Sequence, residues 1–174
     1  YGSFGELLDT FYGERDRRAL VRSRADDLLR TMKAAENRLC RKLDAQRSEL
    51  ADCEHGDDYR RDADLITANL YLIKRGDTDV RLTDYSEMNE DGSFAVRTVK
   101  LDGRLSPSAN AQRLYKKYAK SKTAKRELTK QLALGETELE YVRSALDALS
   151  RAETGAELAE IREELWRSGY AGKQ

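Results

Sequence analysis

A dense run of basic residues follows Pro107, the one proline of the sequence. Residues 112–130 carry eight basic side chains and one acidic one, although the formal net charge of the chain is zero. Tyr115 and Tyr118 lie within this run. A basic segment that also presents exposed tyrosines is the electrostatic footprint of a polyanion binder. The chemistry that this stretch indicates is therefore recognition of phosphate, with RNA as the first candidate.

Two interpretations of this charge remain open at the level of sequence. The lysines could simply solvate a helix and pair with residues 44–58, which carry six acidic side chains and one basic one. However, successive residues of a helix point all round its axis, so several lysines must face away from any one partner. We therefore predict an RNA-binding set, to which basic residues nearer the middle of the chain contribute. Its members are Arg113, Lys116, Lys117, Lys120, Lys122, Lys125, Arg126, Arg75 and Arg104.

No arrangement of residues predicts catalysis or a metal site. The chain has one histidine, His55, and no Gly-rich phosphate loop. Cys40 and Cys53 are separated by about 20 Å of helix at ~1.5 Å per residue, too far for a mutual disulfide. With no CxxC pair and one histidine, a zinc site is not expected. We expect a non-enzymatic protein with no catalytic residue, metal, cofactor or small-molecule substrate.

Residues 15–54 are predicted to form one long helix without glycine or proline. Its apolar residues recur at alternating spacings of three and four, as in a left-handed coiled coil, with Glu36 and Gln46 as polar interruptions. These apolar residues are Leu29, Met32, Leu39, Leu43, Leu50 and Cys53. Residues 55–58 are predicted to break the helix.

A second long helix is predicted to begin at Pro107, with Ser106 as its N-cap. Its seam is polar in the N-terminal half and a regular heptad in the C-terminal half. Gly135, which lies in this seam, marks either a bend or a close approach of the partner helix. The seam comprises Leu114, Tyr118, Ser121, Lys125, Leu128, Leu132, Gly135, Leu139, Val142, Leu146 and Leu149. The helix should end near residues 154–155, and a short amphipathic helix should follow over residues 156–166.

The charges of the two long helices predict how they pair. Residues 15–33 are net basic and residues 44–58 net acidic, whereas residues 112–130 are net basic and residues 136–166 net acidic. An antiparallel pair places each block against its opposite, so we predict an antiparallel pair within one chain.

The intervening residues 59–105 are predicted to form a small α+β head. Residues 64–76 should be an apolar helix, and residues 79–85 and 94–101 alternate like strands around a hairpin loop at residues 89–92. The predicted fold is mainly α: a long intramolecular antiparallel coiled coil with the α+β head at its tip. The segments are 1–58, 59–105, 106–154 and 155–174.

No apolar run approaches the roughly 20 residues that a membrane span needs. The first residues lack the cationic start and apolar centre of a signal peptide. We expect no membrane partner and a cytoplasmic location.

Two stretches of this sequence resemble a known family. Residues 62–76 read DADLITANLYLIKRG and residues 101–124 read LDGRLSPSANAQRLYKKYAKSKTA. These are similar to the middle region of the RqcH/NEMF proteins, also called FbpA or fibronectin-binding A, of the NFACT group. Residues 7–16, LLDTFYGERD, resemble the family's entry into its coiled coil. The matching residues are Asp64, Leu65, Ala68, Asn69, Leu70, Leu105, Pro107, Asn110, Ala111, Gln112, Lys116, Lys117 and Tyr118.

The resemblance implies a function that spacing alone does not. Proteins of this group bind large ribosomal subunits obstructed by peptidyl-tRNA, recruit tRNA and support C-terminal tailing, with alanine in bacteria. Their coiled-coil arm contacts rRNA and the stalk-base protein uL11, so this chain is expected to be a ribosome-associated docking arm, with tRNA as a further candidate partner. Asn110 and Gln112 are expected to tie the second helix to the head. The alternatives are a fibronectin-binding surface adhesin fragment and a structural spacer without a ligand.

Overall fold

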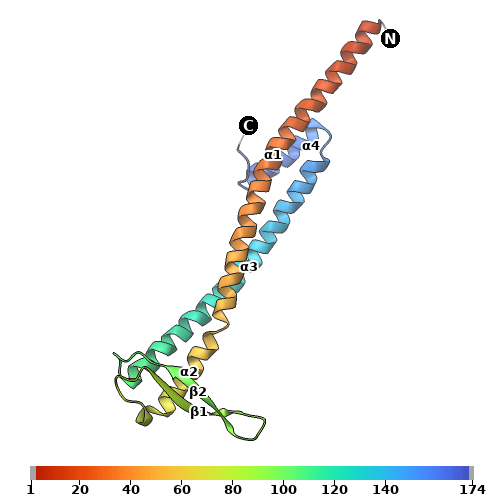
Figure 1. Ribbon diagram of the computed structural model, residues 1–174. Coiled ribbons are helices and arrows are strands. Elements are labelled where there is room, and N and C mark those ends of the chain that lie inside the picture. The colour runs from red at the N-terminus through yellow and green to blue at the C-terminus, as the bar shows by residue number, and fades with distance from the viewer. Residues whose placement is uncertain (1–2, 173–174) are drawn as a thin grey trace. The chain divides into compact units, whose positions relative to one another are not determined.

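The computed structural model describes residues 3–172 (Figure 1). The elements are α1 (Phe4–Cys53), α2 (Gly56–Ala68), the 3-10 turn η1 (Leu70–Leu72), β1 (Asp79–Met88), β2 (Phe94–Lys100), α3 (Pro107–Arg151) and α4 (Gly155–Arg167). The mainly helical class and the single antiparallel hairpin are as predicted. The chain divides into two compact units: unit 1 is the described part of Tyr1–Ala45 and Leu132–Gln174, and unit 2 is Gln46–Gln131.

The first helix begins well before the predicted start at Arg15. Ser3 and Glu6 have the spacing of a capping box, and the Ser3 Oγ accepts a hydrogen bond from the Glu6 N–H at 3.4 Å. Gly5 and Gly13 lower the helix propensity of this stretch but do not prevent the helix from forming. The prediction, which covered only the stretch without glycine, was wrong here because it did not consider this cap.

Unit 1 contains three packed helical segments. Its buried side chains come from α1, α3 and α4, and they include Met32, Val142, Leu149 and Leu165. Figure 1 shows α4 folded back beside α3. Ala25, Leu28 and Ala35 of α1 are buried as well, whereas Leu29 and Glu36 of the predicted seam are only half-buried. In this part of α1 the predicted seam was wrong, because the buried side runs through positions 28 and 35 rather than 29 and 36.

Gly135 is a point of close helix approach, which decides between the two roles predicted for it. A Cβ atom placed on Gly135 would lie 2.6 Å from Leu43 Cδ2 of α1. Further along α3, the Arg143 guanidinium lies 4.0 Å from Cys40 Sγ, and Cys40 precedes Leu43 on α1. Residue numbers therefore rise along one helix as they fall along the other. The predicted antiparallel pairing therefore holds within unit 1.

The tail after α4 is tied to the same unit. Gly169 adopts φ 82°, and the Tyr170 and Gly169 N–H groups donate to Leu165 and Trp166 carbonyls. This Schellman motif turns the chain so that Tyr170 stacks on Tyr141, with ring centroids 6.1 Å apart. Burial and the Glu138 carboxylate raise the pKa of Tyr170 to about 12.

In unit 2, the break between α1 and α2 is shorter than predicted. Only Glu54 and His55 are non-helical, whereas Gly56, Asp57 and Asp58 form the first turn of α2. Carboxylates are favourable in a first turn because they face the positive end of the helix dipole. Gly56 packs against α3, where an added Cβ would lie 2.5 Å from Ser121 Oγ.

The apolar helix predicted over residues 64–76 also ends earlier than expected. The Asn69 side chain donates to the Leu65 carbonyl at 2.9 Å and closes α2 at Ala68, and η1 follows. Asn69 therefore has the structural role of a helix-ending residue. The chain then returns to the core at Ile73.

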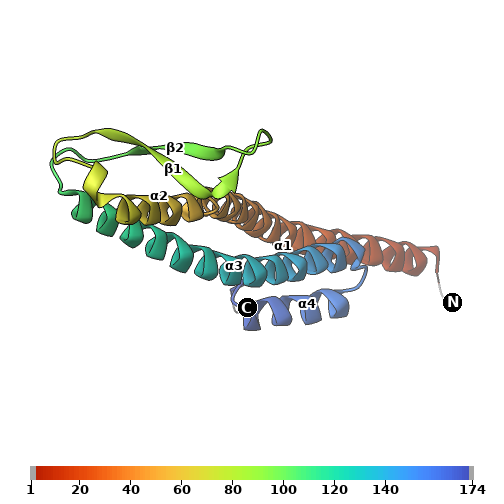
Figure 2. The same ribbon diagram turned by 90° about the horizontal axis from the view of Figure 1, so that it is seen from below.

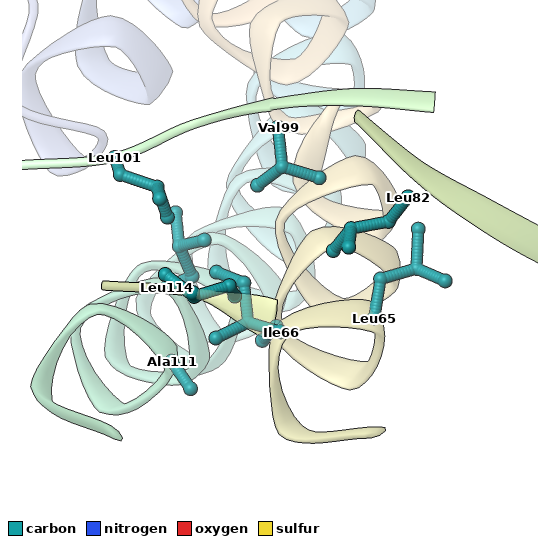
Figure 3. Close-up of a cluster of buried hydrophobic side chains, with 9 residues drawn as sticks. Leu65, Ile66, Leu82, Val99, Leu101, Ala111 and Leu114 are labelled. Carbon is teal, nitrogen blue, oxygen red and sulfur yellow. The ribbon is translucent and has the colours of Figure 1, made fainter. Parts of the chain in front are cut away.

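The hairpin forms as predicted around residues 89–92, and Figure 2 shows it lying along α2. Figure 3 shows the core of this unit, where Leu82 and Val99 of the strands meet Ile66 of α2 and Leu114 of α3.

Two arginines add ionic contacts between α2 and the hairpin. Arg61 Nε lies 2.6 Å from Asp84, and Arg97 Nε lies 2.5 Å from Asp62. These contacts fix the hairpin on α2.

Candidate nucleic-acid interface

The basic segment is positioned by the first turn of α3. The Ser106 Oγ caps the helix by accepting the Ala109 N–H at 3.2 Å, as predicted, and Pro107 occupies the first helical position. Asn110 is 2% exposed; its Oδ1 accepts the Asp102 N–H at 2.8 Å, and its Nδ2 donates to three carbonyls of residues 102–106. Asn110 thus ties α3 to the preceding loop, as expected, whereas Gln112 is exposed.

The predicted RNA-binding residues of α3 do not share one face. At 3.6 residues per turn, Arg113, Lys116 and Lys120 project roughly 100–160° away from the buried Leu114, on one side of the helix. Lys122 and Arg126 project from the opposite flank. Lys125 occupies a predicted seam position but is exposed. This side of α3 therefore carries a smaller set, which we call the outer lysine face: the exposed Lys116 and Lys120, with the half-buried Arg113 beside them.

Most of these cations are not neutralised by nearby carboxylates. Among residues 3–172, no ion pair within 4.0 Å involves Lys116, Lys120 or Lys122, and the same holds for Lys117 and Lys125. Arg126 and Lys130 each lie 3.9 Å from Glu127, which is their neighbour on α3 itself. Pairing of the lysines with the acidic end of α1 therefore does not account for this charge.

The two tyrosines of the segment both contact α2; Tyr115 is exposed, as predicted, whereas Tyr118 is half-buried. The Tyr115 hydroxyl donates to the Asp64 carboxylate, and this bond and partial burial raise the Tyr115 pKa. The Tyr118 ring lies under the Arg60 guanidinium at 5.7 Å from the ring centroid. Lys117 is also drawn inward, with Nζ 5.6 Å from the centroid of the Tyr59 ring. Sequence spacing could not reveal this because it did not show α2 lying across α3.

Arg75 and Arg104 of the predicted set come together at the loops before α3. The Arg75 guanidinium reaches the Arg104 carbonyl at 3.5 Å, and Gly103 packs against the backbone of Gly76. Arg104 donates to Asp102 through its side chain and its backbone N–H, which lowers the pKa of Asp102; Arg113 lowers it further by its charge. Arg113 therefore connects these loops to the outer lysine face.

The sequence interpretation missed the aromatic side chains that are exposed in unit 2. Tyr71 is 82% exposed in η1, and Tyr85 is 73% exposed on the hairpin beside Phe94, with ring centroids 4.9 Å apart. Tyr71 lay within a stretch predicted to be an apolar helix, and the run of Leu70, Tyr71 and Leu72 before Lys74 and Arg75 was the signal available.

The family model described as the NFACT N-terminal and middle domains matches residues 1–174. The chain belongs to the NFACT family. Curated relatives named Rqc2 homolog RqcH are similar over 170 residues, at 34% identity in Streptococcus suis and 31% in Bacillus subtilis. The matches cover 98% of this chain but only 30% and 29% of those relatives, so this NFACT chain spans about a third of their length.

A solved structure is also similar to this NFACT chain. It is the C-terminal part of the fibronectin/fibrinogen-binding protein from Streptococcus suis, with a TM-score of 0.53 and 27% identity. The match covers 88% of this chain and 46% of that chain.

Within residues 3–172, no group of three or more His, Cys, Asp or Glu side chains is arranged to hold a metal ion. No helix of the described chain is long and apolar enough to span a bilayer.

Proposed function

We propose that this chain is the docking arm of an RqcH-like ribosome-associated quality control factor. In this proposal it binds rRNA and the stalk-base protein uL11 on obstructed large ribosomal subunits, in the cytoplasm. Other parts of the protein recruit tRNA and carry out alanine tailing, and the arm itself catalyses nothing. Membership of the NFACT family supports the assignment.

The observation that carries the proposal is the outer lysine face. Lys116 and Lys120 are exposed, project from the same side of α3 and have no carboxylate within 4.0 Å among the described residues. An ammonium group without an internal counter-ion is free to replace the counter-ions of a phosphate backbone, which gives affinity without sequence selectivity. Lys122, Lys125 and Arg126 extend the positive field around the helix.

We also propose that α1 and α3 form one intramolecular antiparallel coiled coil that carries α2 and the hairpin at its tip. The heptad spacing of both helices and the antiparallel contacts inside each unit support this arrangement. A helix of 50 residues is ~75 Å long, so small-angle scattering should give a maximum dimension of at least that length for a monomer. A compact particle would contradict the arrangement.

The test of docking is charge reversal. Lys116→Glu combined with Lys120→Glu should weaken binding to purified large ribosomal subunits at least about tenfold, because two phosphate contacts become repulsive. The slope of log affinity against log salt concentration should fall by about 1.4–1.8. Arg15→Glu combined with Arg18→Glu is the matched control, since it changes the charge equally at exposed positions of α1.

Helix content, measured by circular dichroism, should be the same for both double variants. If the reversed α3 variant binds subunits as tightly as the parent chain, the proposed role of the outer lysine face is wrong. Equal loss in the control would mean that total charge, rather than this face, determines binding.

A second candidate function comes from the name of the structural relative, which is a fibronectin/fibrinogen-binding protein. In this alternative, the chain is part of a surface adhesin. Capture of fibronectin by the purified chain that persists at moderate salt, without affinity for ribosomal subunits, would favour it. Capture that disappears on addition of salt would instead reflect the general charge of α3.

A further inference from the structure

Three consecutive apolar side chains are exposed where α2 ends. Leu70, Tyr71 and Leu72 of η1 are 40%, 82% and 54% exposed. Single exposed apolar residues are ordinary on a protein surface, but a contiguous group at one point is typical of an interaction site. This group lies in unit 2, beside the loop that leads into α3.

The turn that carries Tyr71 is held in place by its own backbone. Asn69 closes α2 on one side, and the Leu72 and Ile73 N–H groups donate to the Asn69 and Leu70 carbonyls at 2.9 and 3.3 Å. Ile66 and Ile73, on either side of the turn, are both buried in the core. The Tyr71 ring is therefore presented from a fixed backbone, so little conformational entropy is lost when a ligand contacts it.

Cations follow the aromatic ring directly. Lys74 and Arg75 come three and four residues after Tyr71 and are exposed, with no carboxylate within 4.0 Å of their charged groups among residues 3–172. The Lys74 backbone N–H is occupied by the Asp77 carboxylate at 2.9 Å, and Gly76 turns the chain with φ 102°. Arg75 then reaches the loop of Arg104.

We propose that residues 70–75 form a site for an unpaired RNA nucleotide. The Tyr71 ring stacks on a base, while Lys74 and Arg75 contact the neighbouring phosphates. Unpaired bases offer a free face for stacking, whereas the bases of a duplex are already stacked on each other, so the site would favour loops over helices. This inference rests on the proposed function, because the outer lysine face supplies the general attraction for RNA and Tyr71 adds the preference for a loop.

RNA fits this site better than an apolar protein surface does. The first two charged side chains after the apolar turn, Lys74 and Arg75, are basic, and the carboxylate of Asp77 that follows them is taken up by the Lys74 backbone N–H. The segment that joins Tyr85 to Phe94 on the hairpin instead contains Glu87, Glu90 and Asp91, which would repel phosphate. The two aromatic sites therefore differ in the charge of their surroundings, and the hairpin serves as an internal control.

The experiment measures the affinity of the 174-residue chain for two fluorescently labelled RNAs by anisotropy. One is a stem-loop with an unpaired loop, and the other is a fully paired duplex with the same number of phosphates. The parent chain should bind the stem-loop at least about fivefold more tightly than the duplex. Tyr71→Ala should abolish this preference and leave duplex binding unchanged, and Tyr71→Phe should restore it. Tyr85→Ala, which removes a similarly exposed ring, should behave as the parent chain.

Equal affinity of the parent chain for the two RNAs would overturn the inference while leaving the proposed function intact. A Tyr71→Ala chain that keeps the preference, or a Tyr85→Ala chain that loses it, would overturn the assignment to Tyr71. Absence of binding to both RNAs would overturn the proposed RNA contact and this inference together. Because Tyr71 is 82% exposed, its replacement should leave the circular dichroism spectrum unchanged.

Discussion

Replacing Asp84 by asparagine tests how the hairpin is held on α2. Asp84 is 3% exposed and accepts hydrogen bonds from Arg61 Nε at 2.6 Å and from the Ser86 N–H and hydroxyl at 3.0 and 2.5 Å. The bonds from Ser86 and Arg61 lower the pKa of Asp84 to about 2. Asparagine keeps the size of the side chain and removes its charge.

The expected loss of stability follows from this pKa. A carboxyl group that titrates near 2 in the folded chain and near 3.9 in the unfolded chain stabilises the fold by about 2–3 kcal/mol when ionised. The Arg61 side chain is 35% exposed, so solvent screens part of its charge and we expect about 2 kcal/mol. Because the folded pKa is the lower one, this contribution is present above about pH 4 and is lost as the pH falls towards 2.

The assay is urea unfolding followed by far-UV circular dichroism, for both chains, between pH 7 and pH 2. The stability difference between the parent and Asp84→Asn chains should be about 2 kcal/mol at pH 7, roughly half of that at pH 3, and close to zero at pH 2. Asp91→Asn is the matched control, since Asp91 makes the same contacts to Ser93 but lies in the exposed turn without an arginine. A difference that is the same at all pH values, or an equal effect of Asp91→Asn, would refute the ionic explanation.

Three further predictions concern packing and polar contacts. Gly13→Ala should increase helix content, because alanine has the higher helix propensity. Gly135→Ala should instead lower the unfolding free energy by about 1 kcal/mol, because the new Cβ atom would overlap the buried Leu43. Equal effects of the two substitutions in urea titrations would contradict this. Asn110→Ala should cost about 2–3 kcal/mol by leaving backbone groups unpaired, while Gln112→Ala should be neutral in thermal unfolding. Burial and Glu138 raise the pKa of Tyr170 to about 12, so its contribution to stability should be complete below about pH 10 and should be lost as the pH rises towards 12. An absorbance titration near pH 12 that Tyr170→Phe leaves unchanged would contradict this.

Elements marked by local signals could be predicted from the sequence. Ser106 and Pro107 fixed the start of α3, and the turn residues 89–92 fixed the hairpin, because caps and turns depend on a few adjacent residues. Two of the helix ends that were predicted wrongly also had local signals. Ser3 and Glu6 form a capping pair, and Asn69 ends α2 with its own side chain.

The environment of the candidate site could not be predicted in the same way. Tyr115 and Tyr118 have the composition of a ligand-binding stretch, but α2 binds the Tyr115 hydroxyl through Asp64 and covers the Tyr118 ring with Arg60. Conversely, Tyr71 lay in an apolar stretch that was predicted to be a helix, but α2 ends at Asn69 before it and Tyr71 is exposed. Which side chains remain available to a ligand depends on contacts between distant segments, and a single sequence does not specify these contacts.

The most direct test of the docking claim is a cryo-EM map of the full-length protein bound to an obstructed large ribosomal subunit. The account predicts that Lys116 and Lys120 lie within hydrogen-bonding distance of rRNA phosphates, with unit 2 against the stalk base. A map in which the outer lysine face points into solvent, while another surface of the chain contacts the subunit, would contradict it.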